Sequence, residues 1–255
     1  MEDRVEGRNA VTELLASGRA VNRLLVLEGA RPGEPLARIV EEARARGVPV
    51  DVMSRRDLDK QSERGAHQGV IALVEPYRYA TLDEIIATGE GKAASLIVAL
   101  DHVTDPGNLG AVVRTAEVVG ADGVIVPKDR AAAMTPSALK AAAGAAEHLS
   151  VLRAANLVQA LERCKREGYW VVGASEKAAD LAWDAPLEGR IVLVLGAEGT
   201  GLARLTERAC DVLVRLPVRG RVSSLNVSAA AAVLSYEWLR RNTAAAGAGD
   251  APCGS

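Results

Sequence analysis

Residues 216–236 read LPVRGRVSSLNVSAAAAVLSY and join the end of a β-branched strand to an alanine-rich helix. Ser223 or Ser224 is a suitable N-cap for a helix over residues 225–241, because a serine hydroxyl accepts a hydrogen bond from a backbone N–H of the first turn. Capping needs only one serine, and the segment also carries a second serine, Asn226 and a glycine. In open α/β sheets, ligands bind at loops that follow the carboxyl ends of strands. The segment therefore predicts either an ordinary capped helix or one wall of a binding site.

The residues before this segment alternate between short apolar strands and helices. Apolar runs that are rich in β-branched residues are typical of strands buried on both faces of a sheet. Strand–helix alternation predicts a parallel sheet covered by helices, so the fold class is α/β. The predicted strands are residues 96–100, 123–126, 169–173, 191–195 and 212–216. The predicted helices are residues 110–119, 136–147, 157–167 and 202–209.

The chain is predicted to have two domains and a tail. Residues 1–75 form a small α/β domain, and residues 76–95 form a linker with a short helical piece, since Pro76, Gly89 and Gly91 interrupt them. Residues 96–241 form the second domain, and residues 242–255 are too rich in Ala and Gly to bury a core, which predicts a disordered tail. In the first domain, helices are predicted at residues 8–16 and 34–46, with strands at 23–27, 48–52 and 69–74.

Composition excludes several classes of protein. The 255 residues are 49% hydrophobic and carry a formal net charge of −2, which argues against non-specific coating of nucleic acid. No apolar run approaches the ~20 residues of a membrane span and the N-terminus is charged, so a cytoplasmic location is expected. Cys164, Cys210 and Cys253 are widely spaced, and neither a disulfide framework nor a metal site is predicted.

The loop after the first strand of the second domain combines a turn with candidate polar residues. Pro106 and Gly107 force a turn, and Asn108 lies near the start of the following helix, where free backbone N–H groups favour an anion. Arg114 comes six residues later and is predicted to reach back toward the mouth of the sheet. By itself, it would be an ordinary surface arginine.

A glycine-rich loop with one carboxylate follows the strand that ends at Leu195. Its sequence, GAEGTGL, contains Gly196, Gly199 and Gly201, but Glu198 stands where a dinucleotide-binding fingerprint needs its middle glycine. A nicotinamide-dependent oxidoreductase is therefore disfavoured. A carboxylate among glycines is instead suited to accept hydrogen bonds from a substrate.

Further candidates lie on neighbouring loops. Residues 173–175 follow another predicted strand and are a fourth possible contributor, starting with Gly173. Arg219 and Arg221 lie in the quoted segment, and Lys128 and Arg130 flank a loop after residues 123–126. Such groups are usually solvated surface, but their position beside the other loops favours a phosphate-containing partner.

Three segments follow one another in a characteristic order: DPGNLGAVVRTAEVVGADGVIVP (105–127), LVLGAEGTGL (193–202) and LPVRGRVSSLNVSAAAAVLSYE (216–237). Together they resemble the signature motifs of the SPOUT-class TrmH/SpoU family of RNA 2′-O-ribose methyltransferases. The first domain, through VEGRNAVTELL (5–15) and HQGVIALV (67–74), is similar to the family's ribosomal-protein-like domain that binds the RNA substrate. Within the family, this layout most resembles bacterial enzymes that methylate a guanosine ribose in the peptidyl-transferase loop of 23S rRNA.

The resemblance implies features that alternation of strands and helices does not. It implies a C-terminal trefoil knot in place of an open sheet, S-adenosyl-L-methionine as the cofactor, no metal, and a homodimer with the active site near its interface. By resemblance, the catalytic and RNA-facing residues are Asn108, Arg114, Glu198, Ser224 and Asn226. The cofactor-binding residues are Gly173, Gly196, Leu216 and Leu225, and the candidate RNA-binding residues are Arg219, Arg221, Lys128 and Arg130.

Two questions stay open in the sequence. The family proposal makes Arg114 the general base, whereas a guanidinium deprotonates only above pH ~12 and is better suited to orient the RNA phosphate. The alternatives for function are 2′-O-methylation of tRNA or of another rRNA site, and a non-catalytic RNA-binding or ribosome-assembly protein.

Overall fold

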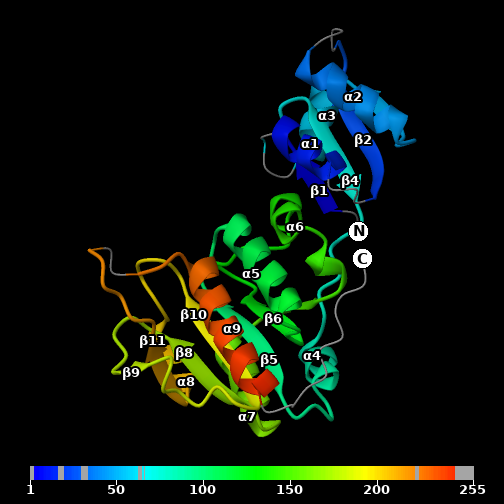
Figure 1. Cartoon of the computed structure of the whole chain (residues 1–255). Helices are drawn as coiled ribbons and strands as arrows, with labels where there is room; N and C mark the ends of the chain where they lie inside the picture. Colours follow the sequence, from blue (N-terminus) through cyan, green and yellow to red (C-terminus); the bar gives the residue numbers. More distant parts are fainter. Residues whose placement is uncertain are drawn as a thin grey trace. The chain divides into compact units, whose positions relative to one another are not determined.

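A computed structural model describes residues 3–16, 20–29, 34–62, 65, 67–221 and 224–244. It contains two compact units, each with its own sheet (Figure 1). The first unit comprises Met1–Arg78 and Met134–Lys140, and the second comprises Tyr79–Ala133 and Ala141–Ser255.

The sheet of the first unit has the strand order β1-β4-β2-β3. β4 runs antiparallel to both β1 and β2, and β2 runs parallel to β3. Helices α1 and α2 pack against this sheet through a core that includes Leu14, Leu24 and Ile39. The strands are β1 (Asp3–Glu6), β2 (Val21–Leu27), β3 (Val50–Met53) and β4 (Val70–Val74), and the helices are α1 (Arg8–Ala16), α2 (Pro35–Ala45) and α3 (Arg55–Gln61).

Two elements of the first unit escape sequence analysis. β1 has only four residues, of which three are charged, so no apolar alternation marks it. α3 is short and polar, and its start depends on Ser54, whose side chain accepts a hydrogen bond from Asp57 N. Burial of Leu58 anchors this helix on the sheet.

The second unit contains the predicted parallel sheet, with the order β7-β6-β5-β10-β8-β11-β9. Every strand pair in it is parallel, and β5 is buried along its whole length. Two strands were not predicted from the sequence: β7, whose exposed Arg153 interrupts the apolar run, and β9, which has only two residues. The strands are β5 (Ser95–Asp101), β6 (Gly123–Pro127), β7 (Ser150–Ala154), β8 (Trp170–Ala174), β9 (Asp180–Leu181), β10 (Arg190–Gly196) and β11 (Val212–Arg215).

Helices cover both faces of this sheet. α5 and α9 lie side by side over one face (Figure 1), and alternate residues of the central strands, such as Ile97 and Val192, pack on the other face with residues of α7. The predicted helix over residues 136–147 is interrupted, because Ala143 and Gly144 have positive φ. The helices of this unit are α4 (Leu82–Thr88), α5 (Pro106–Val118), η1 (Ala145–Glu147), α7 (Leu157–Arg166), α8 (Arg204–Ala209) and α9 (Val227–Ala244). α6 (Pro136–Ala142) lies mostly in the segment Met134–Lys140, which belongs to the first unit.

The predicted linker is largely part of the second unit. Thr81 and Glu84 form a capping box at the start of α4, and Ile85 is fully buried in the same core as the central strands. A Cβ at Gly123 would lie 2.8 Å from Ile85, so this glycine lets α4 approach β6 closely. The short helical piece predicted in the linker is therefore α4, and burial of Ile85 makes it part of the core of the second unit.

The predicted tail begins too early. α9 continues to Ala244, and Asn242 is tied down because its Oδ1 accepts from Gly189 N (2.8 Å) and its Nδ2 donates to the carbonyl oxygen of Leu187 (3.0 Å). Residues 245–255 lie outside the described residues. The trefoil knot stays a prediction, since residues 222–223 in the connection from β11 to α9 also lie outside them.

Candidate active site

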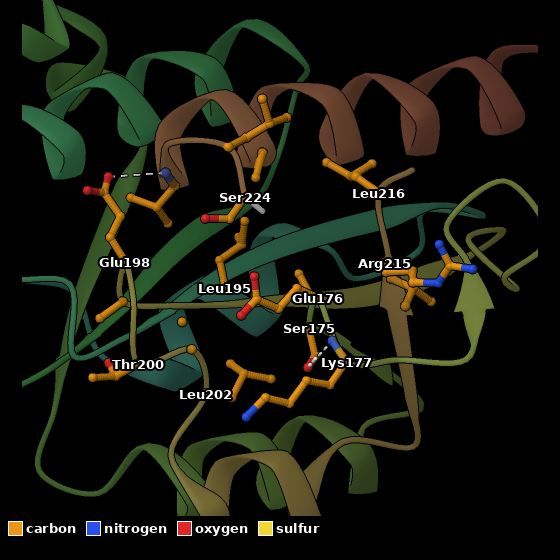
Figure 2. Close-up of a pocket in the computed structure, with 18 of the residues that line it drawn as sticks. Ser175, Glu176, Lys177, Leu195, Glu198, Thr200, Leu202, Arg215, Leu216 and Ser224 are labelled. Atoms are coloured by element: carbon orange, nitrogen blue, oxygen red, sulfur yellow. Dashed lines mark hydrogen bonds between the residues drawn. The ribbon is translucent and has the colours of Figure 1, made fainter. Parts of the chain in front are cut away.

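A cavity of about 170 Å³ opens at the carboxyl ends of β8, β10 and β11 (Figure 2). Its walls come from the ends of these three strands, the residues that follow each of them, Glu207 of α8 and the first half of α9. Leu195, Leu202, Leu216, Leu225 and Leu234 supply apolar surface. The charged side chains that line it are Glu176, Lys177, Glu198, Glu207 and Arg215.

A hydrogen-bonded cluster joins three of the predicted site residues. Asn226 Nδ2 donates to Glu198 Oε1 (2.6 Å) and to Asn108 Oδ1 (2.9 Å), and Asn108 Nδ2 donates to Glu198 Oε1 (3.2 Å). Val227 N points at the same carboxylate oxygen from 3.4 Å. Asn108 lies in the first turn of α5, and Glu198 and Asn226 lie on two separate loops, so the fold assembles a carboxylate held by amide donors beside the cavity.

Asn226 also caps α9, where sequence analysis predicted Ser223 or Ser224. Its Oδ1 accepts from Ser228 N (2.9 Å) and from Ser228 Oγ (2.5 Å), which satisfies a free donor of the first turn. Ser224 instead lines the cavity, and Ser223 lies outside the described residues. One amide side chain thus caps the helix with its oxygen and binds Glu198 with its nitrogen.

Gly196 permits the tight turn of the glycine-rich loop. A Cβ at Gly196 would lie 2.2 Å from the carbonyl carbon of Gly201, which is closer than any side chain tolerates. Gly199 and Gly201 have φ of 79° and 68°, values that favour glycine. The buried Asp101 ties the end of this loop to β5, since its Oδ2 accepts from Ala203 N at 2.7 Å.

Three of the four predicted cofactor-binding residues line the cavity, and one does not. Gly196, Leu216 and Leu225 line the cavity as expected. Gly173 does not, because it is buried behind the wall, and a Cβ there would meet Cys210 Sγ at 2.7 Å. Burial raises the pKa of the Cys210 thiol to about 12, so the thiol is uncharged and packs as an apolar side chain.

Arg114 lies outside the Glu198 cluster. It is exposed on α5, lines no part of the cavity, and makes no hydrogen bond with the residues that the structure describes. Six residues of helix turn a side chain by about 240° from Asn108, so the two cannot share a face. The role of Arg114 at the mouth of the sheet therefore stays a prediction, and the cavity within one chain is lined without it.

The predicted RNA-binding residues form two separate groups, and all four side chains are exposed. Arg219 and Arg221 lie on the loop after β11, next to Val218 of the cavity wall. Lys128 and Arg130 follow β6, which is two strand positions away from β10 on the same edge of the sheet.

Two charged cavity residues, Glu176 and Lys177, were not predicted from the sequence. Glu176 and Lys177 directly follow residues 173–175, which the sequence marks as a possible contributor. Loops that follow parallel strands commonly bind ligands. If the candidate segment after β8 had been extended by two residues, it would have included both side chains.

Two other features are absent from the part of the chain that the structure describes. None of its helices is long and apolar enough to cross a membrane. Within the same residues, no group of histidine, cysteine and acidic side chains could hold a metal ion.

Comparison with protein-family models gives two matches. Residues 95–236 match the SpoU rRNA Methylase family, and residues 4–80 match the RNA 2′-O ribose methyltransferase substrate binding family. The two matches together cover most elements of both units, and α4 (Leu82–Thr88) lies between them.

Individual relatives are similar over nearly the whole chain. The chain is 42% identical to the 23S rRNA (guanosine-2′-O-)-methyltransferase RlmB of Pseudomonas aeruginosa, over 94% of this chain and 97% of RlmB. It is 40% identical to the TrmH family tRNA/rRNA methyltransferase YacO of Bacillus subtilis, over 94% of this chain and 96% of YacO. Among solved structures, the SpoU methyltransferase AviRb of Streptomyces viridochromogenes, in complex with the cofactor AdoMet, matches with a TM-score of 0.62 and 26% identity, covering 94% of this chain and 90% of AviRb.

Proposed function

The chain belongs to the SpoU rRNA methylase family, and we propose that it methylates a guanosine 2′-hydroxyl in the peptidyl-transferase loop of 23S rRNA. The family establishes the broader activity, which is S-adenosylmethionine-dependent 2′-O-methylation of RNA. Support for the narrower substrate comes from the 42% identity to the guanosine methyltransferase of Pseudomonas aeruginosa over nearly the full length of both chains.

The cavity suits S-adenosylmethionine in its chemistry. The cofactor supplies an electrophilic methyl group on a positively charged sulfonium. Leu216 and Leu225 offer apolar surface for a flat purine, and Glu176, Glu198 and Glu207 supply acceptors and negative charge for a cationic ligand. Gly196 keeps the loop backbone close to this space, as a site that binds through backbone groups requires.

The Glu198 cluster is the proposed reacting site. Transfer to a ribose hydroxyl requires that the oxygen be held in line with the methyl group and lose a proton. Asn108 and Asn226 fix the Glu198 carboxylate beside the cavity, and Ser224 adds a hydroxyl to the same wall. Positioning of this kind can supply much of the rate, since well-oriented reactants gain up to ~7–11 kcal/mol over free encounter.

Arg114 is proposed to complete the site across a homodimer interface. It lies on the face of α5 that also presents Val118, four residues later, which is 59% exposed. The adjacent helix α9 exposes Val233 (38%) and Tyr236 (50%). Exposed apolar residues on two neighbouring helices favour contact with a second copy, which would remove Arg114 from bulk solvent and direct its guanidinium to RNA phosphate bound by the partner.

RNA is proposed to contact the first unit and the carboxyl edge of the second. The match to a substrate-binding family supports the first contact. Arg219 and Arg221 beside the cavity, and Lys128 and Arg130 on the same edge, supply positive charge for the phosphates.

Mapping of ribose methylation tests the proposed substrate. RNA from a strain that lacks the gene should lose one 2′-O-methyl group at a guanosine of the 23S peptidyl-transferase loop, and the purified protein should restore it on a transcript of that loop. Restoration on tRNA, with the 23S site unaffected, would show the alternative substrate. Absence of labelled methyl transfer to any RNA would show a non-catalytic protein.

A further inference from the structure

Glu176 is a cavity carboxylate that lacks a hydrogen-bond donor among the described residues. It follows the end of β8, and Figure 2 shows its side chain directed into the cavity near Leu195. Glu198 differs, because Asn108 and Asn226 already donate to it. A carboxylate has only acceptor atoms, so Glu176 is suited to take its donors from a ligand.

The strand order places Glu176 in the middle of the site. Along the sheet the order is β5, β10, β8, β11, with neighbouring strands about 4.8 Å apart. Asn108 follows β5 and Glu198 follows β10, so the proposed reacting site lies at one end of this row. Leu216 follows β11 at the other end. Glu176, after β8, lies between them.

The parts of the cofactor can be placed along this row of strands in the same order. Its sulfonium must face the Glu198 cluster, and its apolar purine suits the wall at Leu216, at the other end of the row. The ribose connects these two parts and carries two hydroxyl donors. A carboxylate at the end of a parallel strand is a general solution for binding ribose hydroxyls in α/β folds.

We propose that Glu176 accepts hydrogen bonds from the 2′- and 3′-hydroxyls of the cofactor ribose and selects for them. This role rests on the cofactor binding in the cavity described above. It makes Glu176 a binding residue, separate from the Asn108, Glu198 and Asn226 cluster.

Calorimetric titration with S-adenosylhomocysteine and its 2′,3′-dideoxy analogue tests the role without turnover. Wild-type protein should bind the ribose-containing ligand at least 10-fold more tightly, since a site built for hydroxyls rejects a ligand that lacks them. Glu176→Ala should bind both ligands with equal affinity. Glu90→Ala, which removes an exposed glutamate far from the cavity, should keep the wild-type ratio.

The competing contacts give different results. If Glu176 instead binds the α-ammonium group, Glu176→Ala will keep the dideoxy penalty, and its affinity for 5′-methylthioadenosine, which lacks the amino acid part, will equal that of wild type. If Glu176 binds the purine amine, Glu176→Ala will bind both ligands more weakly by the same factor, and the ratio will persist. Either result overturns the proposal.

A second variant separates failure of this role from failure of the site. Leu225 is 49% exposed and lines the cavity, so Leu225→Trp should fill the cavity with little effect on folding. Loss of binding in Leu225→Trp, together with an unchanged ratio in Glu176→Ala, rejects only the ribose contact. Unchanged binding in Leu225→Trp rejects the cavity as the cofactor site, and the proposal with it.

Discussion

Glu198 Oε1 and Asn226 Nδ2 lie 2.6 Å apart and connect the glycine-rich loop after β10 to the first residue before α9. The same asparagine caps α9 through its Oδ1, which accepts from Ser228 N. The start of the last helix and the orientation of the carboxylate therefore depend on one side chain.

Asn226→Ser should separate the two roles. Serine still caps a helix, so the melting temperature should stay within about 2 °C of wild type. The amide donor to Glu198 is lost, and methyl transfer to RNA should fall about 100-fold. Asn156→Ser, at the N-cap of α7 away from the cavity, is the matched control and should alter neither quantity. Wild-type turnover in Asn226→Ser would contradict the proposed part of Asn226 in catalysis.

Gly196→Ala should abolish cofactor binding. The added Cβ would come within 2.2 Å of the Gly201 backbone and force the loop away from the cavity. Titration with S-adenosylhomocysteine measures the loss. Gly220→Ala, where a Cβ meets nothing within 4 Å, should bind normally. Equal binding by both variants would show that the loop is not part of the cofactor site.

Arg114→Lys should nearly abolish turnover while the affinity for S-adenosylhomocysteine stays at the wild-type value. Lysine keeps the charge but loses the planar fork that binds phosphate through two hydrogen bonds. Arg166→Lys, an exposed arginine on α7, is the control and should be fully active. The rate of methyl transfer and the affinity for S-adenosylhomocysteine should be measured on the same preparations. A fully active Arg114→Lys variant would show that Arg114 has no part in the mechanism.

Tyr236→Arg should convert a dimer to monomers. A charged side chain at this 50% exposed position of α9 would have to be desolvated in an interface, but it costs little in a free chain. Sedimentation analysis should show loss of the dimer. The melting temperature of the monomer, measured separately, should be unchanged. Leu205→Arg, at a 67% exposed position on α8, should leave the dimer intact. A wild-type protein that sediments as a monomer would reject the interface.

Glu237→Gln should flatten the acid dependence of stability. Hydrogen bonds from Arg240, opposed by burial and reinforced by Arg241, lower the pKa of Glu237 to about 2. Because the folded pKa lies below the unfolded one, the carboxylate stabilises the fold above pH ~4.5, and this contribution is lost as pH falls toward 2. The variant should lose about 1 kcal/mol of unfolding free energy at pH 7 and almost none at pH 2. Denaturant titrations at both values measure the difference, and a constant loss would rule out this linkage.

The local pattern of apolar residues determined most of the second unit. The runs around Ile97, Val124, Val171 and Val192 are apolar on both faces, and each became a buried parallel strand. Elements that depend on distant partners were not placed by this pattern. β7 is an edge strand whose exposed Arg153 interrupts the apolar run, and the helical piece predicted in the linker joins the second unit through burial of Ile85, which a local pattern does not show.

For the site, the sequence by itself determined which loops matter, since Asn108, Glu198 and Asn226 all follow strands of one parallel sheet. Only the tertiary structure decided which side chains meet. In the structure Asn226 caps α9, Gly173 is buried behind the cavity wall, Glu176 lines the cavity, and Arg114 does not line it. Residue type and spacing set the chemistry that each loop can offer, whereas the direction of a side chain depends on strand order, helical phase and close packing.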